Sequence, residues 1–365
     1  MGDSAERPNY ERMDIDTKGE GAVGKAFRNQ VAYCVNNGAP VTARIVAAIW
    51  DTIEGGLDNA LARRIAEWQG APLADALPLR VAGGLHWLHL TGREPALEPI
   101  YRGIGADDTA IVTEAMTVHE AQLLPWLDGP PQTNEAGRSS NFIAAMLWLA
   151  GKGLPPRFEC LEIGSSAGIN LMLDRYHYDL GGVHVGPDDA VMHFTPEWNG
   201  ASPPDEPIAI VSTKGCDVAP VDLTDPDQSE RLKAYIWPEH TIRFERMEAA
   251  IRAATERKPD LERINAADFV ERELAKRQAP GTTRVLMHSI VWQYVPADQQ
   301  ARVTAAMEAA GAKASADAPL AWISVEADRT VHRHNLKVRY WPGGEEATQL
   351  TWSHAHGADI EWLSA

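Results

Sequence analysis

The sequence has few cysteines, no long apolar run and a shortage of basic residues. Its three cysteines, Cys34, Cys160 and Cys216, lie far apart and form no CxxC pair, which argues against a disulfide framework. Reduced thiols in the cytoplasm fit this usage. The strongest candidate for a membrane span, Phe142 to Ala150, is well short of the roughly 20 apolar residues that a spanning helix needs, so it predicts a core helix.

The charge balance is acidic. Lys and Arg together number 34 and Asp and Glu 51, which gives a net charge of -17. Because a charge of this sign repels a polyanion, a nucleic-acid substrate is disfavoured, while a small molecule or a protein partner stays open. Residues 1–21 are polar and lack the apolar segment of a secretory signal. We therefore expect a flexible tail on a cytoplasmic protein without membrane contact.

Two different periodicities divide the rest of the chain. Over residues 22–151 the apolar positions return at steps of three and four, which predicts an all-helical domain. Over residues 152–365 strands alternate with helices, which predicts an α/β domain with a mostly parallel sheet covered on both faces. The seven predicted strands are Phe158 to Ile163, Ile208 to Thr213, Leu261 to Asn265, Arg284 to Ser289, Leu320 to Glu326, Leu336 to Trp341 and Ala347 to Trp352.

Two connections in the second domain stand out. The last two strands are joined through Pro342-Gly343-Gly344, a turn sequence, so we expect an antiparallel hairpin at the edge of the sheet. Residues 178–205 are rich in Gly, Pro and Asp where a short connection is the norm. They are expected to form an inserted loop near a functional site, as long loops in compact domains often do.

The segment Glu162-Ile163-Gly164-Ser165-Ser166-Ala167-Gly168 joins the first predicted strand to a helix. In such a junction, free backbone amides and the positive end of a helix face a ligand. Gly164 allows a sharp turn, and Gly168 lets the helix begin close to the strand. Glu162 is unexpected in a strand that is buried on both faces, since a buried acid is costly unless it is paired or used. A cofactor with a positive amino group supplies such a use.

The pattern Glu162-x-Gly164-x-x-x-Gly168 resembles the first motif of class I S-adenosylmethionine-dependent methyltransferases, with Ser166 where the middle glycine is usual. In that motif an acid and glycines surround the methionine part of the cofactor. The resemblance implies a Rossmann-like sheet and S-adenosylmethionine as cofactor. It implies that the following residues surround the cofactor: Glu162, Gly164, Ser165, Ser166, Gly168 and Asn170.

The same segment also fits Gly-x-Ser-x-Gly, the nucleophile elbow of α/β-hydrolases. Ser166 would be the nucleophile, with His354 or His356 as the base. A hydrolase elbow normally follows several strands of its sheet, whereas only helical segments precede Gly164, and Glu162 has no role in it. A purely structural turn between strand and helix is a third interpretation.

Two acids follow the second and third predicted strands. In methyltransferases that this sequence resembles, an acid after the second strand accepts the ribose hydroxyls and an acid after the third accepts the adenine amino group. Asp217 and Asp268 are the matching residues, and a carboxylate can accept two hydrogen bonds at once. The alternatives are an Asx-turn for Asp217 and a helix N-cap for Asp268.

The fourth predicted strand runs into His288-Ser289-Ile290-Val291-Trp292-Gln293-Tyr294. Ligands of open α/β sheets bind beyond the carboxyl ends of the strands, so this segment is expected to border the substrate. His288 is the candidate general base, because its ordinary pKa lies near neutrality. Gln293 and Tyr294 are expected to face the acceptor with it. Trp292 is expected to line the pocket wall or, alternatively, to pack on the next helix.

A polar decapeptide, Pro131 to Ser140, stands directly before the last helix of the helical segment. Asn134 can cap the next turn. Arg138 can bind the carboxylate of a cofactor or substrate through two parallel hydrogen bonds. We therefore predict that Asn134, Glu135 and Arg138 bind substrate; a salt bridge between Glu135 and Arg138 is the structural alternative.

Several segments together resemble the bacterial domain-of-unknown-function family 2332. The resemblance runs from about residue 25 to the C-terminus and implies one long unit, without an activity to transfer. The segments are Phe27 to Gln30, Gly83 to His86, Pro131 to Ser140, Glu162 to Leu171, Asp174 to Tyr176, Gly215 to Asp217, Trp237-Pro238, His288 to Tyr294 and Trp341 to Gly344.

Two histidine pairs, His332 with His334 and His354 with His356, have the spacing of two metal ligands on one strand. No neighbouring carboxylate or cysteine completes a set, so we predict no metal site. The prediction as a whole is methyl transfer from S-adenosylmethionine to a small molecule. A serine esterase that uses Ser166, or an inactive methyltransferase fold that binds a nucleotide or a partner protein, are the alternatives.

Overall fold

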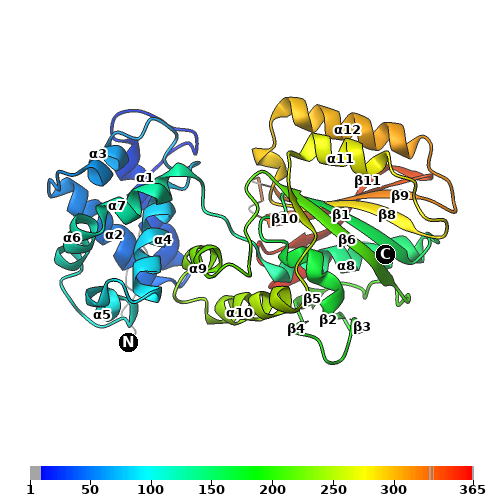
Figure 1. Ribbon diagram of the computed structural model, residues 1–365, viewed down its shortest axis with the longest axis horizontal. Coiled ribbons are helices and arrows are strands. Elements are labelled where there is room, and N and C mark those ends of the chain that lie inside the picture. Colours follow the sequence, from blue (N-terminus) through cyan, green and yellow to red (C-terminus); the bar gives the residue numbers. More distant parts are fainter. Residues whose placement is uncertain (1–9, 329, 332, 364–365) are drawn as a thin grey trace. The chain divides into compact units, whose positions relative to one another are not determined.

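The computed structural model describes residues 10–328, 330–331 and 333–363, which form two compact units (Figure 1). The first unit comprises the chain up to Thr133 together with Asp225–Glu245. The second comprises Asn134–Thr224 and the chain from Arg246 onwards. A mixed α/β fold with a large, mostly parallel sheet after a helical region is thereby confirmed. None of the helices in the described ranges is long and apolar enough to cross a membrane.

The start of the chain was expected to be a flexible tail. Residues 1–9 of that prediction lie outside the described residues. Residues 10–21 contain no helix or strand, but they are attached to the first unit. The backbone N–H of Glu11 donates to Oδ1 of Asn29 at 2.7 Å, and the N–H of Ala74 donates to the carbonyl of Ile15 at 3.2 Å.

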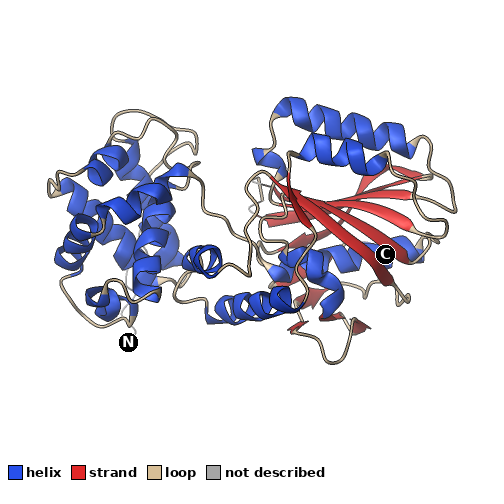
Figure 2. Ribbon diagram, in the orientation of Figure 1, coloured by secondary structure: helices blue, strands red, loops and turns tan. Residues whose placement is uncertain are grey.

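The described part of the first unit consists of helices and loops, as Figure 2 shows. Its helices enclose an apolar core in which Phe27, Ile49 and Leu85 are fully buried. The helices are α1 (Ala22–Asn36), α2 (Pro40–Glu54), α3 (Ala60–Ala66), α4 (Leu77–Leu90), α5 (Glu98–Tyr101), α6 (Asp108–Val118), α7 (Glu120–Leu123) and α9 (Pro226–Ala234), with the first residues of α10 (Thr241–Glu256).

A carboxylate far along the chain caps the first turn of α2. Oε1 of Glu239 accepts from the backbone N–H groups of Val41 at 2.6 Å and Thr42 at 3.0 Å, and Oε2 accepts from the Thr42 hydroxyl at 2.8 Å. The first amides of a helix have no partner within the helix, so a carboxylate there stabilises it through hydrogen bonds and the helix dipole. This contact ties Asp225–Glu245 to the helical unit.

The second unit is built on a nine-stranded sheet in the order β5-β12-β11-β10-β9-β8-β1-β6-β7. Neighbours from β7 to β9 are parallel, and β9 to β12 form an antiparallel meander. The strands are β1 (Arg157–Ile163), β5 (Glu197–Asn199), β6 (Ala209–Asp217), β7 (Leu261–Arg263), β8 (Thr283–Ser289), β9 (Leu320–Asp328), β10 (Arg333–Trp341), β11 (Gly344–Ser353) and β12 (Asp359–Trp362).

The seven predicted strand segments all lie in this sheet, but the predicted count of seven is wrong. The two additional strands, β5 and β12, have three and four residues, too few to show an alternating pattern. They lie beyond β11, so the hairpin of β10 and β11 forms but is not at the sheet edge. Strand β6 also extends through Lys214 to Asp217, which pattern alone had placed after the strand.

Helices cover both faces of the sheet (Figure 1). On one face α11 (Ala266–Leu274) and α12 (Ala297–Gly311) pack on Leu161, Leu286 and Leu320. On the other face lies α8 (Ser139–Gly151), in which every residue from 139 to 150 is buried. The helical periodicity of α8 resembles that of the preceding helices, so the sequence predicts it as part of the helical domain. Because α8 is apolar on all sides, it must be covered by other elements, and the sheet covers it.

The segment between β1 and β6 differs from the prediction. Instead of the regular helix that was expected after Gly168, the chain forms a 3₁₀ helix, η4 (Ile169–Arg175), with non-helical angles at Met172. The expected loop at 178–205 contains part of a small three-stranded sheet of β2 (Tyr176–Leu180), β3 (Val183–Val185) and β4 (Met192–Phe194). Tyr176 and Tyr178 are fully buried, and their hydroxyls donate to carbonyls of η4. Burial of these rings accounts for order in a Gly- and Pro-rich segment.

Replacing Glu239 by Ala is expected to destabilise the helical unit by about 1–2 kcal/mol, because it removes the cap of α2. The measurement is thermal unfolding, with a fall of a few degrees in the midpoint. Glu245→Ala, at an exposed position nearby on α10, is the matched control and should leave the midpoint unchanged. Equal midpoints for the two variants would contradict the cap.

Candidate functional site

The turn after β1 is held in left-handed backbone conformations. The φ angles of Gly164, Ser166 and Gly168 are 66°, 51° and 72°. Glycine adopts such angles at little cost, and a Cβ added at Gly164 would lie 2.2 Å from Cγ2 of Val291. Ser166 is strained by comparison, and its backbone is fixed on both sides. Its N–H donates to Oδ2 of Asp217 at 2.8 Å, and its carbonyl accepts from Val221 at 3.0 Å.

Glu162 lies at the end of β1 beneath this turn and is 1% exposed. Oε1 accepts from Nδ2 of Asn170 at 3.2 Å, whereas Oε2 has no hydrogen-bond partner among the described residues. Burial raises the pKa of Glu162 to about 7, against the lowering effect of the hydrogen bond from Asn170. A buried carboxyl with one unpartnered oxygen is costly, and it therefore suits a site that binds a hydrogen-bond donor.

The predicted polar decapeptide reaches the turn through Asn134. The Asn134 side chain donates to the carbonyl of Ser165 at 3.1 Å and accepts the N–H of Ile169 at 3.0 Å. Asn134 therefore holds the two ends of the turn together. The buried Glu135 pairs with Arg246, whose Nη1 lies 3.5 Å away.

Arg138 is buried between the turn and the antiparallel end of the sheet. Its Nε donates to the carbonyl of Ala355 at 2.9 Å. Its positive charge favours the ionised form of Glu162, and burial together with this charge lowers the pKa of His334. Arg138 thus lies close to an acid of β1 and to a histidine of β10, two residues that are 172 positions apart in the sequence.

Several buried polar atoms around Arg138 and the turn have no partner among the described residues. Arg138 directly precedes α8, and Ser140 and Asn141 in the first turn of that helix are fully buried. Ser353 of β11 is also fully buried and is the register partner of His334. The unpartnered atoms are Oε2 of Glu162, Oγ of Ser166, Oδ1 of Asn170, Oγ of Ser140, Nδ2 of Asn141 and Oγ of Ser353. Because native proteins satisfy most buried polar atoms, this group indicates a place for a polar ligand.

The two acids that were predicted to follow the second and third strands, Asp217 at the end of β6 and Asp268 in α11, have structural partners. Each oxygen of Asp217 accepts one backbone N–H at 2.8 Å, from Ser166 and from Ala219, and the second bond is an Asx-turn. The N-cap of α11 is Asn265, which accepts the N–H of Asp268, so Asp268 is not the cap. The Asp268 carboxylate is half-exposed and pairs with Arg302 at 2.6 Å.

His288 lies on the other face of the sheet from Glu162, because Glu162 pairs in register with Met287 and side chains alternate. His288 is 2% exposed, and its Nδ1 lies 2.7 Å from Oε1 of Glu326. The same oxygen accepts the backbone N–H groups of Val291 and Trp292. Nε2 of His288 is buried without a partner among the described residues. The arrangement is that of a histidine oriented by a carboxylate, which suits proton transfer.

The residues that follow His288 differ in their contact with it and in their exposure to solvent. The Trp292 ring stacks on the His288 ring with centroids 5.1 Å apart. Gln293 and Tyr294 are exposed, and Tyr294 keeps 64% of its surface. Glu326 was missed as a site residue by sequence reasoning, although the predicted fifth strand ended on it and an acid at a strand end was the available signal.

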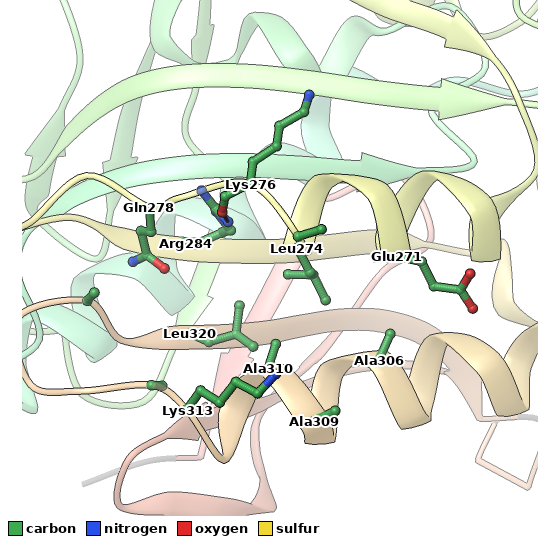
Figure 3. A pocket seen from close by; sticks show the side chains of 13 residues that line it. Glu271, Leu274, Lys276, Gln278, Arg284, Ala306, Ala309, Ala310, Lys313 and Leu320 are labelled. Carbon is green, nitrogen blue, oxygen red and sulfur yellow. Dashed lines mark hydrogen bonds between the residues drawn. The ribbon is translucent and has the colours of Figure 1, made fainter.

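A cavity of about 440 Å³ lies at the opposite edge of the sheet, between α11 and α12 (Figure 3). Arg284, near the start of β8, and Leu320, the first residue of β9, line it. Three of its polar side chains have partners: Arg284 pairs with Glu159, Glu271 pairs with Arg302, and Gln278 donates to two carbonyls. The cavity shares no lining residue with the turn after β1, and none of its lining side chains is among the buried atoms without a partner.

The rings of His354 and His356 lie with centroids 5.3 Å apart, but no group of three His, Cys, Asp or Glu side chains in the described ranges is arranged to hold a metal ion. His332 lies outside the described residues. His354 and His356 follow β11, and the backbone N–H of His356 donates to Nδ1 of His354 at 3.2 Å.

Replacing Glu162 by Gln is expected to stabilise the protein above neutral pH. Between the ordinary Glu pKa of 4.5 and the folded value of about 7, the unfolded carboxyl loses its proton while the folded one keeps it, so stability falls as pH rises through this window. Glu162→Gln removes that loss, which is on the order of 1–3 kcal/mol. Thermal unfolding should show a higher midpoint for Glu162→Gln at pH 8 and no difference near pH 4.

The matched control is Glu346→Gln, at an exposed position of the same unit. It should leave the midpoint unchanged at both pH values. A Glu162→Gln variant that is less stable than the unaltered protein at pH 8 would show that the carboxylate is satisfied in the fold.

Comparison with known proteins gives a family and no further relatives. No curated protein and no solved structure matches the chain. One family matches residues 24–362, which is nearly the whole chain and includes both units. The chain belongs to this family, which is described as "Uncharacterized protein conserved in bacteria (DUF2332)".

Proposed function

We propose that the protein transfers a methyl group from S-adenosylmethionine to a small molecule. The observation that carries this proposal is the unpartnered Oε2 of Glu162, buried at the end of a central parallel strand. A carboxylate in that position stabilises a positive group that is brought to it, and the amino group of the cofactor is such a group.

The chain offers partners of both signs for the amino-acid part of this cofactor. Oε2 of Glu162 and Oδ1 of Asn170 would accept hydrogen bonds from the ammonium group. Arg138 and the Ser140 hydroxyl would hold the carboxylate. A 13-residue helix presents partial positive charge at this end.

The remaining contacts follow the order of the strands. Gly164, Ser165, Ser166 and Gly168 form the turn beside the cofactor, and Asn134 keeps that turn closed. Each oxygen of Asp217 retains a lone pair after its backbone bond, so it would still accept a ribose hydroxyl. Asp268 would reach an adenine amino group only beside Arg302, which already binds it.

When bound, the sulfonium supplies an electrophilic methyl group. The chain then has two tasks, which are to place the acceptor in line with that group and to take up its proton. His288 serves as the base, with Glu326 fixing its ring. Trp292 borders the acceptor, and Gln293 and Tyr294 lie on the exposed side of the same segment. The net charge of -17 favours a small acceptor over a nucleic acid.

Ser166 favours a second candidate, a serine esterase. Its hydroxyl is buried without a partner among the described residues, and its φ of 51° is of the strained kind found at nucleophile elbows. A nucleophilic serine needs a base within hydrogen-bonding distance, and no described histidine bonds this hydroxyl. A methyltransferase fold that binds a nucleotide or a partner protein without turnover is a third possibility.

S-Adenosylhomocysteine should bind the protein with an affinity that depends on the ionisation of Glu162. Its ammonium group requires the carboxylate form, so affinity should fall about tenfold per pH unit below pH 7 and level off above it. Glu162→Gln should weaken binding by at least about tenfold and abolish this pH dependence. Isothermal titration calorimetry between pH 5.5 and 8 is the measurement.

The matched ligand for this titration is 5'-methylthioadenosine, which lacks the amino-acid part. Its affinity should not respond to Glu162→Gln or to pH in this range. Absence of S-adenosylhomocysteine binding up to millimolar concentration would refute the proposal.

A fluorophosphonate probe separates the esterase from the methyltransferase. The proposal predicts that Ser166 of the folded protein stays unlabelled, as judged by intact mass. Covalent labelling that disappears in Ser166→Ala would instead establish the esterase.

A further inference from the structure

The hydrogen bonds of Glu326 determine which nitrogen of His288 carries the proton. Oε1 of Glu326 accepts from the N–H groups of Val291 at 3.3 Å and Trp292 at 3.2 Å, and it lies 2.7 Å from Nδ1 of His288. An ionised carboxylate only accepts hydrogen bonds. Nδ1 of the neutral ring therefore carries the hydrogen, and Nε2 presents a lone pair.

Two complementary atoms on neighbouring rings lack partners. Nε2 of His288 is an acceptor, and the indole Nε1–H of Trp322 is a donor; both are buried and unpartnered within the described part of the chain. The two rings come from neighbouring strands, β8 and β9, with centroids 6.1 Å apart. Leu286 pairs in register with Trp322, so His288 and Trp322 lie on the same face of the sheet.

We propose that His288 and Trp322 hold the reacting group of the methyl acceptor and that this group is a hydroxyl. A hydroxyl donates its hydrogen to Nε2 and accepts the Trp322 N–H with one lone pair. Its second lone pair stays available for attack. A neutral amine has a single lone pair, and if that pair accepts the Trp322 N–H, none is left to attack the methyl group. A hydroxyl therefore fits this pair of atoms better than an amine does.

The surroundings favour a flat, aromatic acceptor such as a phenol. The Trp292 ring stacks on His288 and lies edge-on to Trp322, with centroids 5.5 Å apart in the second pair. Both indoles are only partly buried, so part of each ring faces solvent. Aromatic walls of this kind bind planar apolar groups through ring contacts.

The role of this site as an acceptor site rests on the proposed function. In the transfer, the hydroxyl proton moves to Nε2 of His288 while the hydroxyl oxygen forms a bond to the methyl carbon. The bond between that carbon and sulfur breaks, and its electron pair stays on sulfur. The products are a methyl ether, a neutral thioether and an imidazolium that the Glu326 carboxylate stabilises.

The test uses phenol and anisole as probes, without the cofactor. In ¹H–¹⁵N spectra of the full-length protein, phenol should shift the Trp322 indole signal and the Nε2 signal of His288. Anisole has no hydroxyl hydrogen and should bind about tenfold more weakly or not at all. Trp322→Phe assigns the indole signal and should weaken phenol binding by about tenfold. Trp237→Phe, in the helical unit, is the control and should leave phenol binding unchanged.

Equal binding of phenol and anisole, or phenol binding that leaves both signals in place, overturns the hydroxyl site. If Trp322→Phe fails to fold, the His288 Nε2 signal alone decides the result. Phenol binding at these atoms in a protein that does not bind S-adenosylhomocysteine would keep the hydroxyl site and refute methyl transfer. Binding of S-adenosylhomocysteine without preference for phenol would refute only the hydroxyl site.

Discussion

The buried carboxyl group of Glu162 is the constraint on which the rest of the site depends. Desolvation raises its pKa to about 7, and one of its oxygens lacks a partner among the described residues. The fold lowers this cost through Asn170 and the charge of Arg138 without removing it. A residue that destabilises the fold in this way is typical of a binding site. A ligand that donates the missing hydrogen bond to the buried carboxyl removes the cost.

Distant segments of the second unit converge to keep that carboxyl in place. Asn134 spans the turn after β1, Asp217 accepts an amide of the same turn, and Val291 packs on Gly164 from the loop after β8. The carboxyl ends of parallel strands meet at one edge, so the ends of β6 and β8 lie beside the turn after β1, and Asn134 reaches the same turn from the segment before α8. The two faces of the sheet carry different groups. The Glu162 face carries charged groups, and the other face carries His288 between a carboxylate and indole rings.

The larger features of the fold could be predicted from the sequence because the periodicity of apolar residues extends over whole strands and helices. The alternation of strands and helices predicted the parallel sheet, and the turn sequence at Pro342-Gly343 predicted the hairpin of β10 and β11. Strands β5 and β12 are too short to produce a pattern, and the small sheet around Tyr178 depends on tertiary burial of its rings. Within the site, Glu162 was recognisable as an acid in a buried strand. Glu326 and Trp322 were not, because their roles arise from the pairing of β8 with β9, which no local pattern encodes.

The central claim is that Glu162 is buried in order to bind the amino group of the cofactor. A crystal structure of the protein soaked with S-adenosylhomocysteine tests it most directly. The account predicts the ligand amino nitrogen within hydrogen-bonding distance of Oε2 of Glu162, and the ligand carboxylate near Arg138 and the first turn of α8. A ligand bound elsewhere, with Oε2 of Glu162 still unpartnered or bonded to another group of the protein, would contradict it.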